Sequence, residues 1–109
     1  MFIAINRFSV LPGKEGAFEA LWLGRETHLE DVPGFVGFNI MRGPKGEDHT
    51  LYASHTAWRS RADFEAWTRS EAFRAAHKNA WDSTGLYIGR AKLELFESLQ
   101  EVLPAKVSA

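Results

Sequence analysis

Apolar and polar residues alternate along three stretches of the chain, which is the pattern of β-strands with one buried face. These stretches are Phe2–Val10, Thr50–Trp58 and Ala91–Leu99. A further strand is predicted over Phe35–Arg42, because the run Gly43–Asp48 that follows it is rich in turn-forming residues and suits a hairpin loop. The sequence therefore predicts four strands, two of which form a hairpin.

Between the first and second strands, the spacing of apolar residues changes to that of a helix. Phe18, Leu21 and Trp22 fall on one face of a helix predicted over Glu15–Leu29. The pair Pro33–Gly34 closes this segment, since both residues interrupt helices.

A second helical segment follows the third strand. Ser60 suits its N-cap, because a serine oxygen can accept a hydrogen bond from a free backbone N–H of the first turn. The segment carries Trp67, and the pair Ser70–Glu71 is expected to bend or restart the helix. The turns beyond that pair carry Phe73 and His77.

Residues 79–89 lose the periodic pattern and are predicted to form a mobile loop. The order of elements is then β-α-β-β-α-β, which places the chain in the α+β class with the ferredoxin-like arrangement. We expect a single domain over residues 1–104 and a loose C-terminal tail over residues 105–109.

Composition narrows the functional classes. The chain has 109 residues, of which 45% are hydrophobic and 13% aromatic, enough for a core and for a flat aromatic-lined cavity. A domain of this size buries only a modest share of its surface by itself, so pairing of subunits is expected. The chain has no cysteine, which excludes disulfides, thiolate metal sites, iron–sulfur clusters and a cysteine nucleophile.

Charge and hydropathy argue against two kinds of partner. The formal net charge is -1 and both signs are mixed along the chain, so neither a nucleic acid nor an anionic membrane is expected to bind. Residues 1–7 do not resemble a signal peptide, and no stretch approaches the roughly 18 apolar residues of a membrane span. We therefore expect a cytoplasmic protein.

Asn6 is the unusual residue of the first strand. It lies centrally on the face that carries Phe2, Ala4, Phe8 and Val10, where an apolar residue would be expected. Taken by itself, Asn6 fits a buried amide whose polar atoms are satisfied by neighbouring backbone.

His77 admits two interpretations. Imidazole is a common axial ligand of haem iron, whereas a histidine near the C-terminus of a helix also interacts favourably with the helix dipole. The other histidines, His28, His49 and His55, lack zinc-site spacing such as His-Glu-x-x-His, so no dedicated metal site is predicted. Trp67 by itself fits a core aromatic residue.

The run from Trp58 to His77 reads W-x-S-x-x-x-F-x-x-W-x-x-S-x-x-F-x-x-A-H. It closely resembles the IsdG-type haem-degrading monooxygenases of the antibiotic biosynthesis monooxygenase superfamily, and it meets every fixed position of their pattern. The pairs Asn6–Arg7 and Gly34–Phe35 match the family as well. The resemblance covers about residues 2–99, although the loop Lys78–Gly89 matches no family pattern.

Carried over to this chain, the resemblance implies a role for each matched residue. His77 would be the proximal ligand of the haem iron, and Asn6 a hydrogen-bond donor on the opposite, distal side. Trp67 would press on the porphyrin and help to buckle it out of plane, with Phe73 as a further haem contact. Haem would be both the substrate and the oxygen-activating cofactor, and ring opening would release iron and a linear tetrapyrrole.

The resemblance also implies a homodimer whose two four-stranded sheets form a dimeric α+β barrel, with Ile3 and Ile5 as candidates for its interior. Electrons would come from an external reductant through an electron-donating reductase, since the sequence holds no Gly-rich dinucleotide motif. Two alternatives stay open: a cofactor-free monooxygenase of the same superfamily acting on an aromatic polyketide or quinol, and a non-catalytic haem-binding protein. The tetrapyrrole product and the role of residues 78–89 are not predicted.

Overall fold

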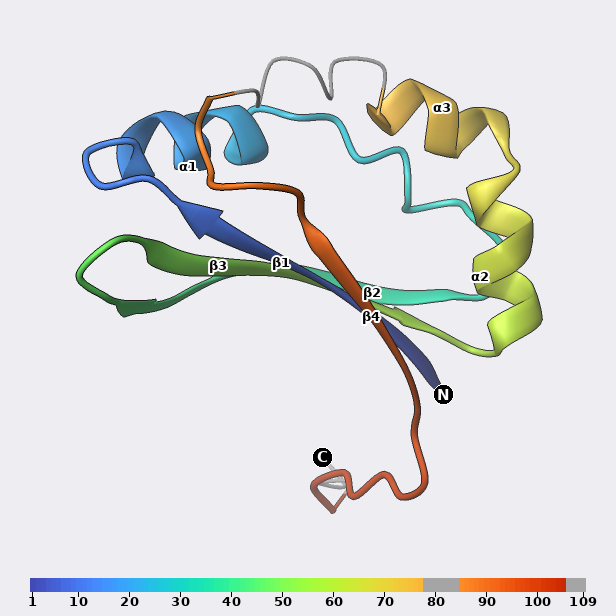
Figure 1. Ribbon diagram of the computed structural model, residues 1–109. Coiled ribbons are helices and arrows are strands. Elements are labelled where there is room, and N and C mark those ends of the chain that lie inside the picture. The colour runs from blue at the N-terminus through green and yellow to red at the C-terminus, as the bar shows by residue number, and fades with distance from the viewer. Residues whose placement is uncertain (78–84, 106–109) are drawn as a thin grey trace.

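The elements follow one another along the chain as the sequence predicts, with the second helical segment divided in two. They are β1 (Phe2–Val10), α1 (Glu15–Leu23), β2 (Phe35–Lys45), β3 (Thr50–Trp58), α2 (Arg61–Thr68), α3 (Glu71–His77) and β4 (Lys92–Glu97). The computed structural model describes residues 1–77 and 85–105, without the side chains of residues 76 and 77. The ferredoxin-like α+β arrangement is confirmed (Figure 1).

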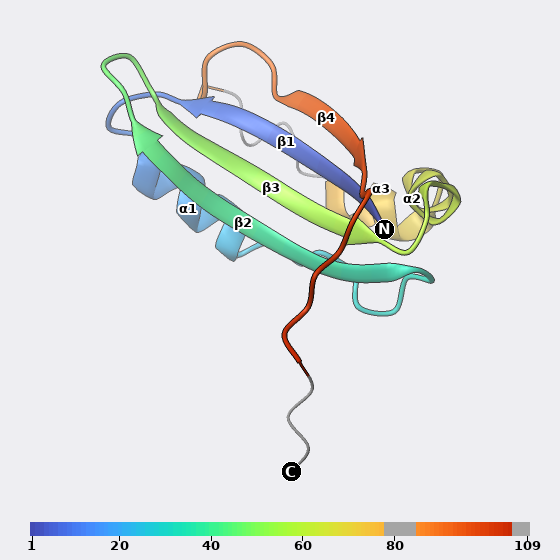
Figure 2. The ribbon, with the colours of Figure 1, turned by 90° about the horizontal axis from the view of Figure 1, so that it is seen from below.

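The four strands form one antiparallel sheet in the order β2-β3-β1-β4. β1 lies centrally and pairs with β3 along its whole length, from Phe2↔Trp58 to Val10↔Thr50. The three helices lie over the same face of this sheet, and no described helix covers the other face (Figures 1 and 2).

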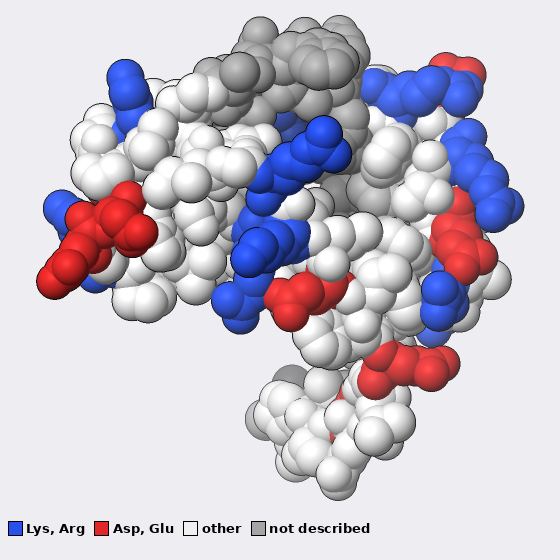
Figure 3. Space-filling model, viewed as in Figure 1, with Lys and Arg blue, Asp and Glu red and all other residues white. Residues whose placement is uncertain are grey.

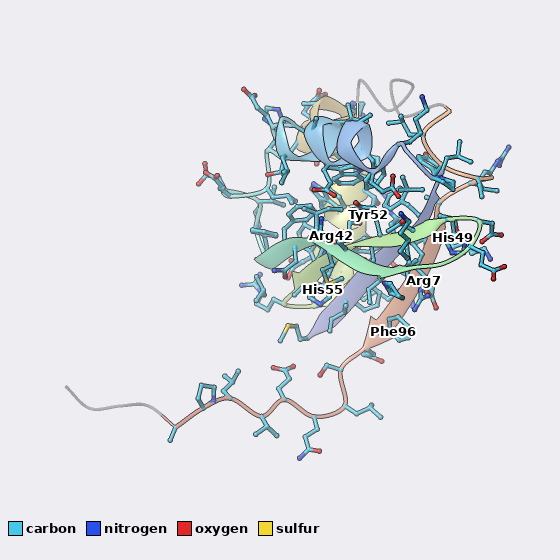
Figure 4. The ribbon with its side chains drawn as sticks, turned by 90° about the vertical axis from the view of Figure 1, so that its left-hand side faces the viewer. Arg7, Arg42, His49, Tyr52, His55 and Phe96 are labelled. Atoms are coloured by element: carbon cyan, nitrogen blue, oxygen red, sulfur yellow. The ribbon has the colours of Figure 1, made fainter. Side chains whose placement is uncertain are left out.

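Period-two alternation decides which side chains reach the helices. Tyr52 points up towards them, whereas Arg7, His55 and Phe96 lie on the uncovered face (Figure 4). We call this uncovered side the open face. Residues 98–105 leave the sheet near β4 and extend away from the body on that side (Figure 1).

Helix α1 is shorter than predicted. It ends at Leu23 and not at Leu29, and the backbone N–H of Gly24 caps it by bonding to the carbonyl of Ala20. Leu29 is 4% exposed and packs into the core beside α2, so burying it requires the chain to leave the helix. Among the described residues, no helix has the length and apolar character needed to cross a bilayer.

The strand boundaries shift at the loops. β2 continues to Lys45 and not to Arg42, and the turn is tighter than predicted, with the N–H of Gly46 donating to the carbonyl of His49 at 2.7 Å. Pro44 is tolerated because β2 is an edge strand, where a missing N–H breaks no ladder. β4 is shorter than predicted, spanning Lys92–Glu97.

The predicted mobile loop lies only partly within the described residues, because residues 78–84 fall outside them. Its end, residues 85–89, is not a free loop but is bonded to the end of β1. The N–H of Leu11 donates to the carbonyl of Leu86 at 2.9 Å, and the N–H of Ile88 donates to the carbonyl of Ser9 at 2.7 Å. Of the tail predicted to be loose, residues 106–109 likewise lie outside the described part.

The core consists of two separate clusters, one at each end of the sheet. The first lies under α2 and the second under α1. The buried members of the first are Phe2, Ala4, Leu29, Trp58, Phe64 and Trp67, and those of the second are Phe8, Val10, Phe18 and Tyr52. The middle of the sheet therefore carries no large buried side chain among the described residues.

Gly34 lies just before β2 and packs closely against the start of α2, where the N–H of Arg59 donates to its carbonyl at 2.8 Å. We expect Gly34→Ala to destabilise the fold. Its φ is +82°, and a Cβ there would overlap the side chain of Asp63. Denaturant unfolding should show a loss of about 1–3 kcal/mol. Gly16→Ala in α1 is the matched control, because a Cβ at Gly16 meets nothing within 4 Å. Equal effects of the two substitutions would contradict the conformational role of Gly34.

Candidate functional site

A step in side-chain size along the two central strands leaves a hollow in the helix-covered face. On β1 the inward residues run from Phe2 through Ala4 and Asn6 to Phe8, and β3 opposes them with the same pattern. Its inward residues are Trp58, Thr56, Ser54 and Tyr52, in register with those four. Large rings at both ends and small side chains in the middle create a floor that lies lower than its surroundings.

A cavity of about 290 Å³ lies over this floor, between the sheet and the helices. Its described lining includes the floor residues, aromatic walls from both core clusters and Leu93 of β4. The full lining is Ala4, Asn6, Trp22, Arg25, Thr27, Leu29, Phe38, Ser54, Thr56, Phe64, Trp67, Thr68, Phe73 and Leu93. Mostly apolar walls around a few polar groups are typical of a site for a small organic ligand.

The aromatic walls are held by ring–ring contacts. Trp67, 9% exposed, lies 5.1 Å from Trp58 and 4.8 Å from Phe73 between ring centroids. On the other side, Trp22 and Phe38 stack nearly parallel at 6.3 Å with an interplanar angle of 15°. Contacts of this kind fix ring planes, so the cavity is bounded by flat surfaces suited to a flat ligand.

The floor carries an amide and a hydroxyl side by side. Asn6 and Ser54 are direct partners in the β1–β3 register, and both line the cavity. Neither side chain has a hydrogen-bond partner among the described side chains and backbone. The sequence-based interpretation of Asn6 as an amide satisfied by backbone is therefore wrong for the described part of the chain.

A second, more polar hollow of about 840 Å³ adjoins the cavity. It lies between residues 25–31 and α3, and Arg25 and Thr27 line both spaces. The guanidinium of Arg25 lies 4.5 Å from the centroid of Trp22, a cation–π contact that holds a positive charge at the border of the two. The hollow beyond Arg25 is acidic, because its lining includes four carboxylates, Glu26, Glu30, Asp31 and Glu71.

The predicted bend at Ser70 is confirmed, and its cause is a side-chain cap. α2 ends at Thr68 and α3 begins at Glu71. The hydroxyl of Ser70 donates to the carbonyl of Trp67 at 2.6 Å and accepts from the N–H of Phe73 at 3.1 Å. One serine thus links the two aromatic wall residues across the break.

The start of α2 is capped as the sequence predicts. The N–H of Asp63 donates to the side-chain oxygen of Ser60 at 3.2 Å, and the Ser60 hydroxyl donates back to the Asp63 carboxylate at 3.0 Å. The hydrogen bond from Arg59, and next that from Ser60, lowers the pKa of the Asp63 carboxyl. The acidic and basic side chains over α2 are accordingly intermixed (Figure 3).

A buried phenol holds α1 against the sheet. The hydroxyl of Tyr52 donates to the carboxylate of Glu19, which also pairs with Arg42 at 3.3 Å. Burial, followed by the bond to Glu19, raises the pKa of Tyr52 to about 12, so the phenol is neutral at physiological pH. This group does not line the cavity.

The described cavity lining holds no carboxylate and no histidine. Its polar groups are the Asn6 amide, hydroxyls such as that of Ser54, and the guanidinium of Arg25. Among the described residues, the cavity can therefore orient a ligand by hydrogen bonds and by one positive charge, whereas the histidine and carboxylates nearest to it, His28 among them, line the adjoining hollow.

Three of the four predicted site residues meet at this cavity: Asn6 from β1, Trp67 from α2 and Phe73 from α3. The fourth, His77, is the last residue of α3, and its side chain lies outside the described part of the structure. Its predicted role as the metal ligand stays a prediction.

The remaining histidines lie elsewhere. His28 has a left-handed backbone with φ of 57° and pairs with Glu26 at 3.5 Å, while His49 pairs with Asp48 at 2.7 Å. His55 lies on the open face (Figure 4). The described residues contain no group of three or more histidine, aspartate or glutamate side chains placed to hold a metal ion.

The structure adds residues that the sequence-based prediction missed, above all Ser54, Arg25 and Phe38. The sequence holds a signal for Ser54 that becomes clear only with the strand register. Small residues, Ser54 and Thr56, occupy the positions of β3 that lie opposite Asn6 and Ala4 of β1. Arg25 fell within the helix predicted over Glu15–Leu29, whereas α1 ends at Leu23. Phe38 becomes a wall residue only through the pairing of β2 with β3.

Comparison with known proteins identifies the family to which this chain is similar. Residues 1–79 match the model of the family described as antibiotic biosynthesis monooxygenase. A heme-degrading monooxygenase of Bacillus thuringiensis (strain Al Hakam) is 35% identical over 51 residues, which are 47% of this chain and 48% of that protein. One from Shouchella clausii (strain KSM-K16) is 41% identical over 49 residues, 45% of this chain and 46% of that protein. The match thus spans about half the length of these relatives.

Solved structures match over nearly the whole chain. A variant of MhuD with two manganese protoporphyrin IX molecules bound per active site has a TM-score of 0.75 and 30% identity, covering 95% of this chain and 100% of that one. The heme-degrader MhuD from Mycobacterium tuberculosis, with two hemes bound in its active site, has a TM-score of 0.67 and 27% identity, covering 94% and 99%. SnoaB from Streptomyces nogalater, a cofactor-independent oxygenase, shares the fold at 20% identity and a TM-score of 0.68, covering 93% and 95%.

The cap at Ser70 should contribute measurably to stability. We expect Ser70→Ala to lower the free energy of unfolding by about 1 kcal/mol, because the first turn of α3 loses its side-chain acceptor. Ser70→Asn, which keeps an acceptor, should restore most of the loss in the same urea titration. If the alanine variant were as stable as the unsubstituted protein, the Ser70 cap would not stabilise the junction between α2 and α3.

Proposed function

The chain belongs to the antibiotic biosynthesis monooxygenase family, and we propose that its reaction is the oxidative opening of haem. The observation that carries the proposal is the unpartnered Asn6 amide on the floor of a flat-walled apolar cavity. Two matched relatives are named heme-degrading monooxygenases, and the matched MhuD structures hold porphyrins. These names support haem as the ligand.

The described residues fit a haem group. Trp67 and Phe73 on one side, and Phe38 on another, offer flat apolar surface for a porphyrin. Arg25 lies at the border of the cavity and the hollow, and it is proposed to pair with a propionate of such a ring at that border, outside the carboxylates that line the rest of the hollow. The cavity of about 290 Å³ is small for haem by itself, and the adjoining hollow of about 840 Å³ supplies further room.

His77 is proposed as the proximal iron ligand. It ends α3, the helix that follows the Ser70 break and carries Phe73 at the cavity. Asn6 lies on the sheet, on the other side of the space from the helices, where its N–H can donate to an electronegative ligand atom. Trp67 is proposed to press on the ring from the helix side and to favour its distortion, a recognised way for proteins to tune haem.

When bound, haem supplies the redox chemistry that activates dioxygen. The protein's own residues then bind the ring, orient it and exclude water from it. Electrons come from an external reductant, for which a partner reductase is the proposed source. The products are iron and a linear tetrapyrrole.

Two rival functions make different demands on the cavity. A cofactor-free oxidation of an aromatic polyketide or quinol would benefit from a general base that ionises the substrate. The described lining of the cavity itself contains no carboxylate or histidine, and the carboxylates and His28 of the adjoining hollow lie outside it. A non-catalytic haem-binding protein would need the iron ligand but no donor on the distal side. The free amide of Asn6 therefore favours the catalytic proposal over simple carriage.

A homodimer is the proposed assembly, because the open face exposes large apolar side chains to water beside the Arg7–Glu94 ion pair. It carries Ile3, Ile5 and Ala57 towards its middle, with Met41 and Phe96 exposed at 40% and 47%. The segment beyond β4 also exposes Leu99 and Val102, at 98% and 83%. Apolar patches of this kind commonly mark interfaces, and a second copy would cover both sheets at once.

The function is tested by adding haemin to the purified protein, recording the Soret band and then supplying ascorbate in air. Catalase must be present, because free peroxide bleaches haem without an enzyme. We expect a Soret band that decays with release of iron, and His77→Ala should abolish the ligated spectrum. Asn6→Ala should keep the band and lose its decay.

Each other outcome removes a specific proposal. A stable band in the unsubstituted protein would indicate haem carriage, and no band would favour the polyketide or quinol substrate. A normal spectrum in His77→Ala would refute the ligand assignment, and normal decay in Asn6→Ala would remove Asn6 from the reaction.

Sedimentation tests the dimer. The unsubstituted chain should sediment at micromolar concentration with twice its mass of 12.3 kDa. Ile5→Glu, which places a charge in the middle of the open face, should yield a folded monomer. Leu23→Glu is the matched control, since Leu23 is 73% exposed on α1, away from that face. A sharp monomer for the unsubstituted chain would contradict the proposed assembly.

A further inference from the structure

Ser54 occupies a position that its residue type does not explain. It is 7% exposed, it lies at the centre of the sheet, and its register partners are Asn6 on β1 and Ile40 on β2. Its hydroxyl has no hydrogen-bond partner within the described residues. The hydroxyl oxygen is not among the fully buried side-chain atoms that lack a partner, so it is accessible from the cavity and available to a ligand there.

Thr56 provides an internal comparison. It is the next inward residue of β3, it also lines the cavity, and it is 8% exposed. Its hydroxyl, however, donates to the backbone carbonyl of Ala4 at 3.3 Å. The two neighbouring hydroxyls therefore differ in one respect: that of Thr56 is used within the sheet, and that of Ser54 is available to the cavity.

Ser54 and Asn6 are placed to act on the same ligand atom. Directly opposed residues of antiparallel strands have Cβ atoms about 4.5–5.5 Å apart, so an amide N–H and a hydroxyl projecting from the same side can converge above the floor. The row that contains them is completed by Ile40 and Leu93 on the two edge strands. The polar pair thus sits alone within an apolar row.

We propose that Ser54 is a positioning residue whose hydroxyl, together with the Asn6 amide, hydrogen-bonds to the small ligand that shares the cavity with haem on the sheet side. The proposal rests on the proposed haem function and adds a second donor to it. Two donors that converge from two strands fix the direction of a small ligand, which one donor does not. Surrounding apolar walls strengthen both bonds by excluding water.

Azide, a small anion that binds ferric haem, is the probe. The haemin-loaded protein is titrated with azide in its ferric state, and the azide infrared band is recorded at saturation. Ser54→Ala should weaken azide binding about tenfold, the loss expected for one hydrogen bond to a charged ligand. The azide band should also shift, because its frequency reports the hydrogen bonds that the anion accepts. Neither readout depends on turnover.

Two further variants separate positioning from structure. Ser54→Thr keeps the hydroxyl and should restore both the affinity and the band position. Thr56→Val removes the neighbouring hydroxyl that is already bonded to Ala4, and it should leave azide binding as in the unsubstituted protein. The Soret band of each variant before azide is added shows whether haem is still bound in the same way.

The outcomes distinguish the two proposals. If the unsubstituted protein gives no Soret band with haemin, the haem function and the role of Ser54 both fall. If haem binds but Ser54→Ala retains normal azide affinity and an unshifted band, only the role of Ser54 falls. Loss of haem by Ser54→Ala, or an equal effect of Thr56→Val, would likewise overturn it, because Ser54 would then support the fold and not the ligand.

Discussion

The site depends on one packing constraint, which is that the two central strands carry large rings at their ends and small side chains in the middle. Phe2 and Trp58 pack under α2, and Phe8 and Tyr52 pack under α1. Since a helix needs large side chains beneath it to bury its apolar face, each helical unit settles over one end of the sheet. The space between them becomes the cavity, and its floor is made by residues too small to fill it.

The same constraint determines the chemistry of the cavity. The floor pairs Asn6 with Ser54, both neutral, beneath mostly apolar, aromatic walls. Donors in such surroundings are effective because they are fixed before the ligand arrives. A protein of this kind positions a reactive ligand and leaves the redox step to that ligand, which is what oxidative haem opening requires.

Much of the fold follows from local sequence patterns. β1 and β3 were predicted from strict alternation, and the cap at Ser60 was predicted because a serine oxygen satisfies a free N–H group at a helix start. The break at Ser70 was also predicted, but the side-chain cap that causes it was not. The end of α1 was not predicted correctly, since it depends on the burial of Leu29 against residues far along the chain. Asn6 was recognised as misplaced on its face, whereas Ser54 was overlooked because its meaning comes from strand register. His77 remains a prediction from resemblance.

The central claim is that this chain inserts oxygen from dioxygen into haem. The most direct measurement is mass spectrometry of the tetrapyrrole formed from haemin and ascorbate under isotopically labelled dioxygen, with catalase present. The account predicts a linear tetrapyrrole that carries the heavy isotope of oxygen. Recovery of intact haem, or a product whose oxygen comes only from water, would contradict it.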